Sequence, residues 1–406
     1  MTTYDVQELA RKILDQIKSE RDGMANLNVM VLGKTGVGKS TLINNLFNEN
    51  FADTGIGKPV TDQIKAFTKE GVPLTIYDTP GLELGGGKSY DSLLDQVSKV
   101  IKDKAKSGDV EQAIHCILYC VNANSHRFED KEIEFIKKFS EENQRYEIPV
   151  IVVVTQTHSK KEAEALIASI KQENLNVCQI VPVLASSFEL DDEYTIQAFG
   201  LEHLTEVIYE VIPEAIKKTF VSVQKANIKM KAQKSQLVVL AAASAAAATG
   251  AVPIPVADAF VLVPEQIAML ASITNIYGLS IEKSAISAVV SATLGTASAT
   301  IAGKTVVSSL LKLIPGYGSA VGGAISGGVA AAITAALGEA YIAVMTAVAT
   351  GEMKETDITS SKGKKYITEL FKSRLKLKRD NKGVIMDDEA DDTDSKPKRL
   401  RIGKKK

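Results

Sequence analysis

The 406-residue sequence has almost no net charge and few cysteines. Its 48 Lys and Arg stand against 49 Asp and Glu, so a strong overall attraction to nucleic acid or anionic lipid is excluded. Three cysteines in apolar runs form no disulfide framework and indicate a reducing compartment. Because no signal peptide opens the chain, we expect a protein that faces the cytosol.

Hydrophobic residues make up 45% of the chain, which excludes a wholly disordered protein, and the length allows two or three domains. The residue pattern predicts six parts. They are an N-terminal amphipathic helix (1–27), an α/β domain (28–212), a linking helix (213–235), an apolar helical domain (236–351), a charged helix (352–380) and a disordered acidic and basic tail (381–406).

Short apolar runs alternate with helical patterns in the α/β region. Continuous apolar strands separated by helices predict a mostly parallel sheet that is covered on both faces. Phosphate ligands bind such sheets at the carboxyl ends of the strands. The predicted strands are 29–32, 74–77, 114–121, 150–154 and 180–184, with a more polar edge strand at 63–68.

The run Gly33-Lys34-Thr35-Gly36-Val37-Gly38-Lys39-Ser40 fits the phosphate-loop pattern G-x-x-x-x-G-K-[ST]. It follows a predicted strand and opens a predicted helix, which is the context that the pattern requires. Glycines let main-chain N–H groups close around phosphates, and the helix N-terminus adds its positive dipole end. We expect Lys39 to bridge the β- and γ-phosphates and Ser40 to offer its hydroxyl to Mg²⁺.

A second element, Asp78-Thr79-Pro80-Gly81, follows the predicted strand at 74–77. An acid at a strand end can hold Mg²⁺ through water, and the glycine N–H can contact a γ-phosphate. Between the two elements, Thr61 is the candidate threonine that senses the γ-phosphate through Mg²⁺; an ordinary loop threonine is the other interpretation. The candidate metal ligands are therefore Ser40, Thr61 and Asp78, and the candidate catalytic residues are Lys39, Thr61 and Gly81.

Together, residues 33–40, Thr61, residues 78–81 and the strand ending in Val154-Thr155 resemble the G1 to G4 elements of translation-factor-related GTPases. Era-like, septin-like and immunity-related branches are the most similar. The resemblance covers about residues 28–212 and implies a P-loop GTPase domain that binds GTP and GDP with Mg²⁺. It also implies that the nucleotide is contacted by Thr41, by Thr155 and Gln156, and by Ser186 in a loop that closes over the base.

Two departures from the family pattern matter. The base-reading motif usually ends in an aspartate, but here it reads Thr155-Gln156-Thr157-His158, and histidine cannot provide a bidentate carboxylate. The preference for GTP over ATP therefore follows from the resemblance alone. Leu82 stands where many small GTPases have the glutamine that orients water, so we expect slow turnover. A partner, a second copy or another residue such as Arg127 would supply the missing group.

The apolar region 236–351 contains only seven charged residues, and the runs 284–303 and 313–338 contain none. Both runs reach the roughly 20 residues that a membrane span needs. Two interpretations stay open: a membrane-associated helical hairpin, and a buried bundle that packs through small residues. Overlapping G-x-x-x-G spacings at 318–327 fit either, and prolines at 253, 255 and 315 predict helix breaks.

Residues 235–350 also resemble a helical domain of unknown function that is fused to Era-like GTPases in bacteria, which implies membrane association. The tail 396–406 carries seven basic residues in eleven, a pattern that attracts anionic lipid or nucleic acid. We expect guanine nucleotide as the ligand, membrane lipid through 236–351 and the tail, and a second copy across the nucleotide face; nucleic acid is the less favoured partner.

These observations favour a GTPase switch that couples its nucleotide state to a membrane-associated helical domain, in the cytoplasm at a membrane. Two alternatives come from other classes. One is a ribosome- or RNA-binding assembly GTPase, supported by the basic tail. The other is a membrane or pore protein that binds nucleotide and barely hydrolyses it.

Overall fold

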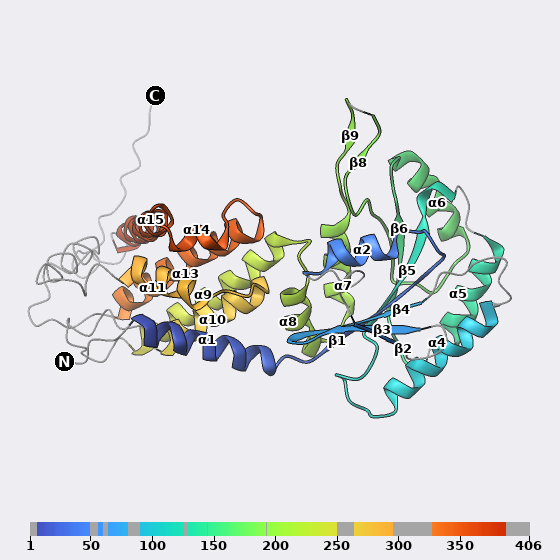
Figure 1. The fold of residues 1–406 in the computed structure, drawn as a ribbon, viewed down its shortest axis with the longest axis horizontal. Coiled ribbons are helices and arrows are strands. Elements are labelled where there is room, and N and C mark those ends of the chain that lie inside the picture. Colours follow the sequence, from blue (N-terminus) through green and yellow to red (C-terminus); the bar gives the residue numbers. More distant parts are fainter. Residues whose placement is uncertain are drawn as a thin grey trace, which may run out of the picture.

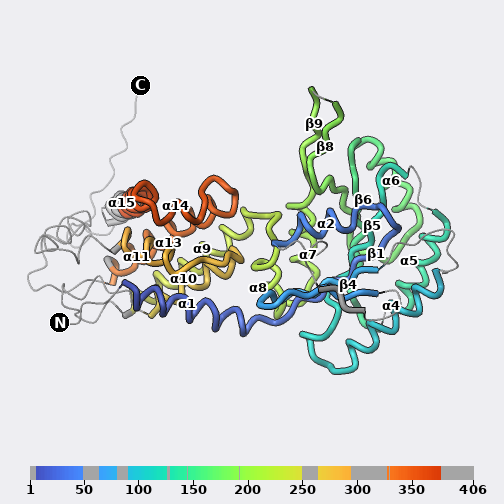
Figure 2. The backbone as a smooth tube through the Cα atoms, in the orientation of Figure 1, coloured from blue at the N-terminus to red at the C-terminus, as the bar shows by residue number. Residues whose placement is uncertain are grey.

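The computed structural model describes residues 6–48, 56–59, 64–79, 90–125, 129–143, 145–191, 193–249, 264–294 and 327–386. Figure 1 shows an elongated molecule, with an α/β domain at one end and a bundle of helices at the other. The backbone trace in Figure 2 shows that the chain enters through the bundle, builds the α/β domain and then returns to the bundle.

The α/β domain is built on a seven-stranded sheet in the order β2-β3-β4-β1-β5-β6-β7. The five strands from β4 to β7 in this order are parallel, and β3 and β2 continue the sheet in antiparallel pairing. The mostly parallel sheet predicted from the sequence is therefore confirmed. The strands are β1 (Leu27–Gly33), β2 (Ile56–Pro59), β3 (Lys65–Lys69), β4 (Val72–Asp78), β5 (Cys116–Asn122), β6 (Val150–Thr155) and β7 (Gln179–Pro182). The polar strand predicted at 63–68 is β3, but β2 lies outside it and forms the edge.

Helices cover both faces of the sheet, which explains why every residue of β1 is buried. Val29 and Val31 pack on one face with α2 (Lys39–Leu46), α7 (Leu201–Val211) and α8 (Glu214–Val223). Met30 and Leu32 pack on the other face with α4 (Tyr90–Ala105), α5 (Asp130–Asn143) and α6 (Lys160–Gln172). Alternation of side chains along one strand thus builds two cores. A short helix η1 (Ala123–Ser125) follows β5, and a hairpin of β8 (Phe188–Glu189) and β9 (Thr195–Ile196) projects from the domain in Figure 1.

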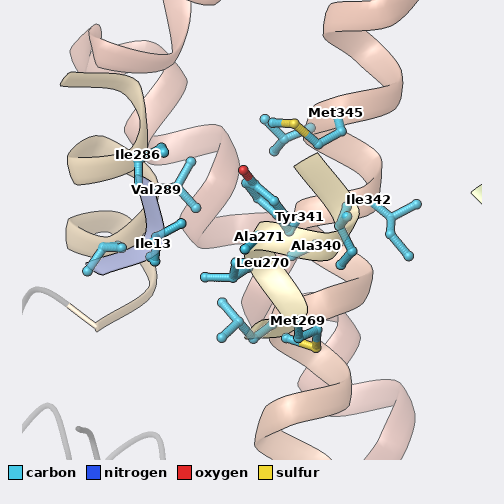
Figure 3. Packing of buried hydrophobic residues seen from close by; sticks show 14 of the residues in the cluster. Ile13, Met269, Leu270, Ala271, Ile286, Val289, Ala340, Tyr341, Ile342 and Met345 are labelled. Carbon is cyan, nitrogen blue, oxygen red and sulfur yellow. The ribbon is translucent and has the colours of Figure 1, made fainter. Parts of the chain in front are cut away.

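The bundle has one continuous hydrophobic core, part of which is shown in Figure 3. The N-terminal helix belongs to this bundle: Leu9, Ile13 and Ile17 are buried against α10 and α11. The predicted amphipathic helix in 1–27 is thus α1, and its apolar stripe packs on the helical domain. The helices are α1 (Val6–Asp22), α9 (Ile228–Thr249), α10 (Pro264–Tyr277), α11 (Lys283–Leu294), α13 (Gly327–Ala349), α14 (Glu355–Thr359) and α15 (Ser361–Met386).

Two predicted helices differ from the structure. The single linking helix expected over 213–235 is instead α8 and α9, with a break at Gln224–Asn227. The break is stabilised by side chains, because Asn227 Oδ1 accepts a hydrogen bond from Met230 N at 2.8 Å and so caps α9. The charged helix expected over 352–380 is α14 followed by α15, which extends to Met386. The first six residues of the predicted tail are therefore helical, and 387–406 lie outside the described residues.

Small residues set the packing of α9 against α13. A Cβ atom added to Gly327 would lie 2.1 Å from the Ala247 carbonyl oxygen, so the two backbones approach closely at this point. This contact fits the buried-bundle interpretation. In the described part of the chain, one helix, Ala330–Ala349, has the length and composition to cross a membrane, and 61% of it is buried. The predicted breaks at 253–255 and 315, and the glycines at 318, 322 and 323, lie outside the described residues.

Candidate functional site

The loop between β1 and α2 has the geometry of an anion cradle. Gly36 and Gly38 have φ values of 76° and 92°, a region that L side chains rarely adopt, and Gly38 caps the start of α2. Among the described residues, the backbone N–H groups from Gly38 to Thr41 donate no hydrogen bond to a backbone group outside α2. These free donors at a helix N-terminus are the groups that bind phosphate.

Lys39 is folded back over the loop. Its Nζ donates hydrogen bonds to the carbonyl oxygens of Gly33 and Lys34, each at 3.0 Å. Burial lowers the pKa of Lys39, and the Asp78 carboxylate opposes this shift. The ammonium group is therefore held at the mouth of the cradle, from which it can exchange the two carbonyl oxygens for phosphate oxygens.

Asp78 ends β4 beside β1, where its Cα pairs with that of Val31. Its Oδ1 is buried and has no hydrogen-bond partner among the described residues. Burial raises the pKa of Asp78, and the Lys39 ammonium opposes the rise. Ser40 is exposed in the first turn of α2. An orphaned carboxylate oxygen and a free hydroxyl are hard oxygen ligands that fit Mg²⁺.

The Lys34 side chain forms ion pairs at the start of α5. Its Nζ lies 2.6 Å from Glu129 Oε1 and 3.0 Å from Glu132 Oε2, at the start of α5. Glu132 is 3% exposed, and its burial raises the pKa of the carboxyl while Lys34 opposes that rise. The phosphate loop is thus fixed to α5 by a largely buried ion pair that the motif did not reveal.

The loop after β6 is joined directly to the phosphate loop. The Thr155 hydroxyl contacts the carbonyl oxygen of Val37, and Gln156 Nε2 donates to the Gly36 oxygen at 2.7 Å. Gln156 has a positive φ of 53°, which turns the chain back toward the cradle. The structure therefore brings Thr155 and Gln156 to the phosphate loop, and their predicted contact with the nucleotide stays a prediction.

Residues that the sequence did not single out surround His158. Its ring lies against that of Phe188 with centroids 4.1 Å apart, and its Nδ1 is 3.3 Å from Asn124 Nδ2. Asn122 Nδ2 donates to Gln156 Oε1 at 3.2 Å. Asn122 and Asn124 stand at the carboxyl end of β5, so the rule that ligands bind at this edge of a parallel sheet could have identified them.

The remaining candidate residues are exposed or lie outside the described residues. Thr41 is exposed in the first turn of α2, and Ser186 is exposed in the loop before β8. Thr61, Gly81, Leu82 and Arg127 lie outside the described residues. Their predicted contacts with the γ-phosphate, the metal ion or the attacking water stay predictions.

Comparison with known families identifies the domain that carries this cradle. Residues 28–156 match a family profile described as 50S ribosome-binding GTPase. Residues 28–156 are a P-loop GTPase domain. Residues 218–376 match a second profile, Domain of unknown function (DUF697), which begins within α8 and ends within α15. The chain is thus a P-loop GTPase domain fused to a helical DUF697 domain, in agreement with the resemblance seen in the sequence.

Among characterised proteins, the GTPase domain is similar to septins. Septin-9 of Rattus norvegicus is 31% identical over 152 residues, which cover 32% of this chain and 27% of that protein. Septin-1 of Drosophila melanogaster is 28% identical over 221 residues, covering 49% and 58%. A crystal structure of a probable GTP-binding protein engB aligns at 21% identity and a TM-score of 0.32, over 45% of this chain and 97% of that one. The chain thus spans between 27% and 58% of the length of these two septins.

Proposed function

We propose that this protein binds and hydrolyses GTP and acts as a switch that couples its nucleotide to a membrane-associated helical domain. The observation that carries the proposal is the cradle itself. Free N–H groups, the Lys39 ammonium and the orphaned Asp78 oxygen meet at the end of β1 and β4, on the domain that matches GTPases.

In this proposal, different residues bind the phosphates and the metal ion. The amides from Thr35 to Thr41 and the Lys39 ammonium would bind the phosphates, and Ser40 and Asp78 would hold Mg²⁺. When bound, Mg²⁺ neutralises charge on the phosphate oxygens. In this proposal Thr61 and Gly81 contact the γ-phosphate, and loss of that contact after hydrolysis releases both segments.

Slow turnover is part of the proposal. Leu82 can neither donate nor accept a hydrogen bond, so the group that orients the attacking water comes from outside the motif. A second copy that docks across the nucleotide face would supply it. Phe188, whose ring lies against His158, is an exposed apolar side chain that such a copy could cover, and Leu190 and Tyr194 of the same hairpin are also exposed.

The membrane part of the proposal is supported by α9. Leu237 and Leu240 are 60% and 65% exposed, and the helix carries no charged residue from Ser235 to Thr249. An exposed, uncharged helix face of this kind fits the acyl boundary of a bilayer. The apolar helix α13, by contrast, is mostly buried and fits a soluble core equally well.

Two experiments test the proposal. GTP turnover is measured at rising protein concentration, with and without anionic liposomes; rates per molecule that rise with concentration support completion of the site by a second copy.

Liposome flotation then compares Leu240→Glu with Gln233→Glu, which adds the same charge to an exposed position of the same helix. Loss of flotation in Leu240→Glu alone supports the membrane contact, whereas equal behaviour of both variants contradicts it. Binding without turnover in any condition favours a non-enzymatic membrane or pore protein.

A second candidate is a ribosome- or RNA-binding assembly GTPase. Its support is the description of the matching profile, together with the basic run 396–406, which lies outside the described residues. Co-sedimentation with ribosomes that is lost when 396–406 is deleted would favour this candidate over the membrane switch.

A further inference from the structure

The helix that starts at the phosphate loop ends against the helical domain. α2 has eight residues, so its two ends are only about 12 Å apart. Beyond its last turn, Asn48 N donates to the Val223 oxygen at 2.8 Å, and Lys225 N donates to the Leu46 oxygen at 2.9 Å. A short β-bridge between Phe47 and Gln224 completes the contact. The end of α2 is therefore fixed to the break between α8 and α9.

A fully buried lysine holds this junction together. Lys231 is 1% exposed, and its Nζ donates to the carbonyl oxygens of Val221 and Ser222 at 2.7 and 2.9 Å. The carbonyl oxygens of Ile276 and Tyr277 also lie 2.7 and 3.2 Å from Nζ, so its three N–H groups share four acceptors. These carbonyl groups belong to the last turns of α8 and α10, whose negative dipole ends favour an ammonium group. No acidic side chain forms an ion pair with Lys231 among the described residues.

Burial without a carboxylate is costly for an ammonium ion, and it lowers the pKa of Lys231 well below the usual value. Any apolar side chain of similar length would fill the same space without that cost. The lysine therefore does more than fill a cavity. It fixes the end of α8, a helix that also packs on the sheet, to the end of α10 in the bundle.

The Ser222 carbonyl oxygen is shared between the lysine and α2. It accepts from Lys231 Nζ and also from Asn48 Nδ2, at 2.8 Å. The Ser222 hydroxyl donates to the Asn275 oxygen at 2.6 Å in α10. Gly278 completes the contact, because a Cβ atom there would lie 2.2 Å from the Ser222 oxygen and 2.3 Å from Asn48 Nδ2. The ends of α2, α8 and α10 thus meet around one carbonyl group.

We propose that Asn48 and Lys231 are positioning residues for the nucleotide site, which link the far end of α2 to α10 in the helical domain. This inference rests on the proposed function, because it assumes that nucleotide binds at Lys39 and Ser40. A helix of two turns moves as one body, so a shift at its phosphate end also displaces its Asn48 end. By linkage, if nucleotide binding stabilises one arrangement of the helical domain, that arrangement increases the affinity for nucleotide by the same coupling free energy.

Hydrogen exchange of the full-length protein, with and without GDP and Mg²⁺, tests the link. In the wild type, GDP should slow exchange at residues 33–40 and also at 275–278, the end of α10. Asn48→Ala should keep the first protection and lose the second. Asn45→Ala is the matched control, since Asn45 Nδ2 donates to the Thr41 oxygen within α2 itself, and it should keep both.

A second pair of variants separates positioning from general stability. Lys231→Met should lose the transmitted protection and weaken GDP binding about fivefold, the lower end of typical coupling. Lys229→Met, an exposed position on the same helix, should change neither. If GDP still protects residues 275–278 in both Asn48→Ala and Lys231→Met, the inference is wrong. It is also wrong if GDP protects residues 33–40 but not residues 275–278 in the wild type. If residues 33–40 are not protected at all, the proposed function itself fails.

Discussion

Replacing Lys39 with methionine tests the phosphate cradle most sharply, since it removes the ammonium group and keeps most of the side-chain length. A hydrogen bond to a charged group contributes about 1.5–3 kcal/mol, which corresponds to roughly 10- to 150-fold in affinity. Lys39 Nζ donates hydrogen bonds to the carbonyl oxygens of Gly33 and Lys34. Nucleotide binding exchanges these two contacts for phosphate contacts, so we expect the lower part of that range, about 10- to 30-fold.

The assay is equilibrium titration with a fluorescent GDP analogue in the presence of Mg²⁺. Lys34→Met is the matched control, because it removes a second ammonium from the same loop whose partners are Glu129 and Glu132. Its GDP affinity should change much less than that of Lys39→Met. Wild-type affinity in a folded Lys39→Met protein would refute the reasoning, and so would an equal loss in both variants, because the Lys39 ammonium would then contribute no more than the ion pair of the loop with α5.

Three further predictions concern stability. Lys34→Met leaves the Glu132 carboxylate buried without its cation, so urea denaturation should show a loss of about 1–3 kcal/mol that Glu132→Gln partly restores; no loss would contradict the buried pair. His115 accepts a hydrogen bond from Asn28 N at 2.8 Å, and burial lowers its pKa below 6.5, so the unfolded chain binds a proton that the folded chain disfavours. The stability that neutral His115 gives to the folded protein should be complete above pH 6.5 and decline below it. The melting temperature of His115→Gln should therefore depend less on pH than that of the wild type, and identical pH profiles would show that His115 does not cause the dependence. Ile13→Ala, at a fully buried position of α1, should cost about 2–5 kcal/mol in thermal or urea unfolding, and an unchanged transition would mean that α1 does not pack on the bundle.

The sequence predicted the parts of the site that a local pattern specifies. Gly33 to Ser40 form the expected loop between a buried strand and a helix because glycine positions, lysine and helix start are all adjacent in the chain. Asp78 was placed correctly at a strand end by the apolar run before it. Its position beside β1 follows from parallel pairing, which the alternation of strands and helices already indicated.

Features built by distant segments could not be predicted in the same way. The contact of His158 with Phe188 depends on the β8–β9 hairpin, which follows β7 in the chain. The ion pair of Lys34 with Glu132 joins the loop after β1 to α5, almost 100 residues later. The burial of Lys231, by contrast, could have been predicted from its spacing in the sequence. Lys231 stands four and eight residues before Ser235 and Val239, so all three share the buried face of α9.

The central claim is that the cradle binds a guanine nucleotide although His158 replaces the usual aspartate. Competition of unlabelled GTP and ATP against a fluorescent GDP analogue on the full-length protein tests it most directly. We predict that GTP displaces the analogue and that ATP requires about 100-fold more, which is below the roughly 10⁴-fold discrimination of a fully paired polar site because His158 provides no carboxylate. Equal displacement by both nucleotides, or displacement by neither, would contradict the account.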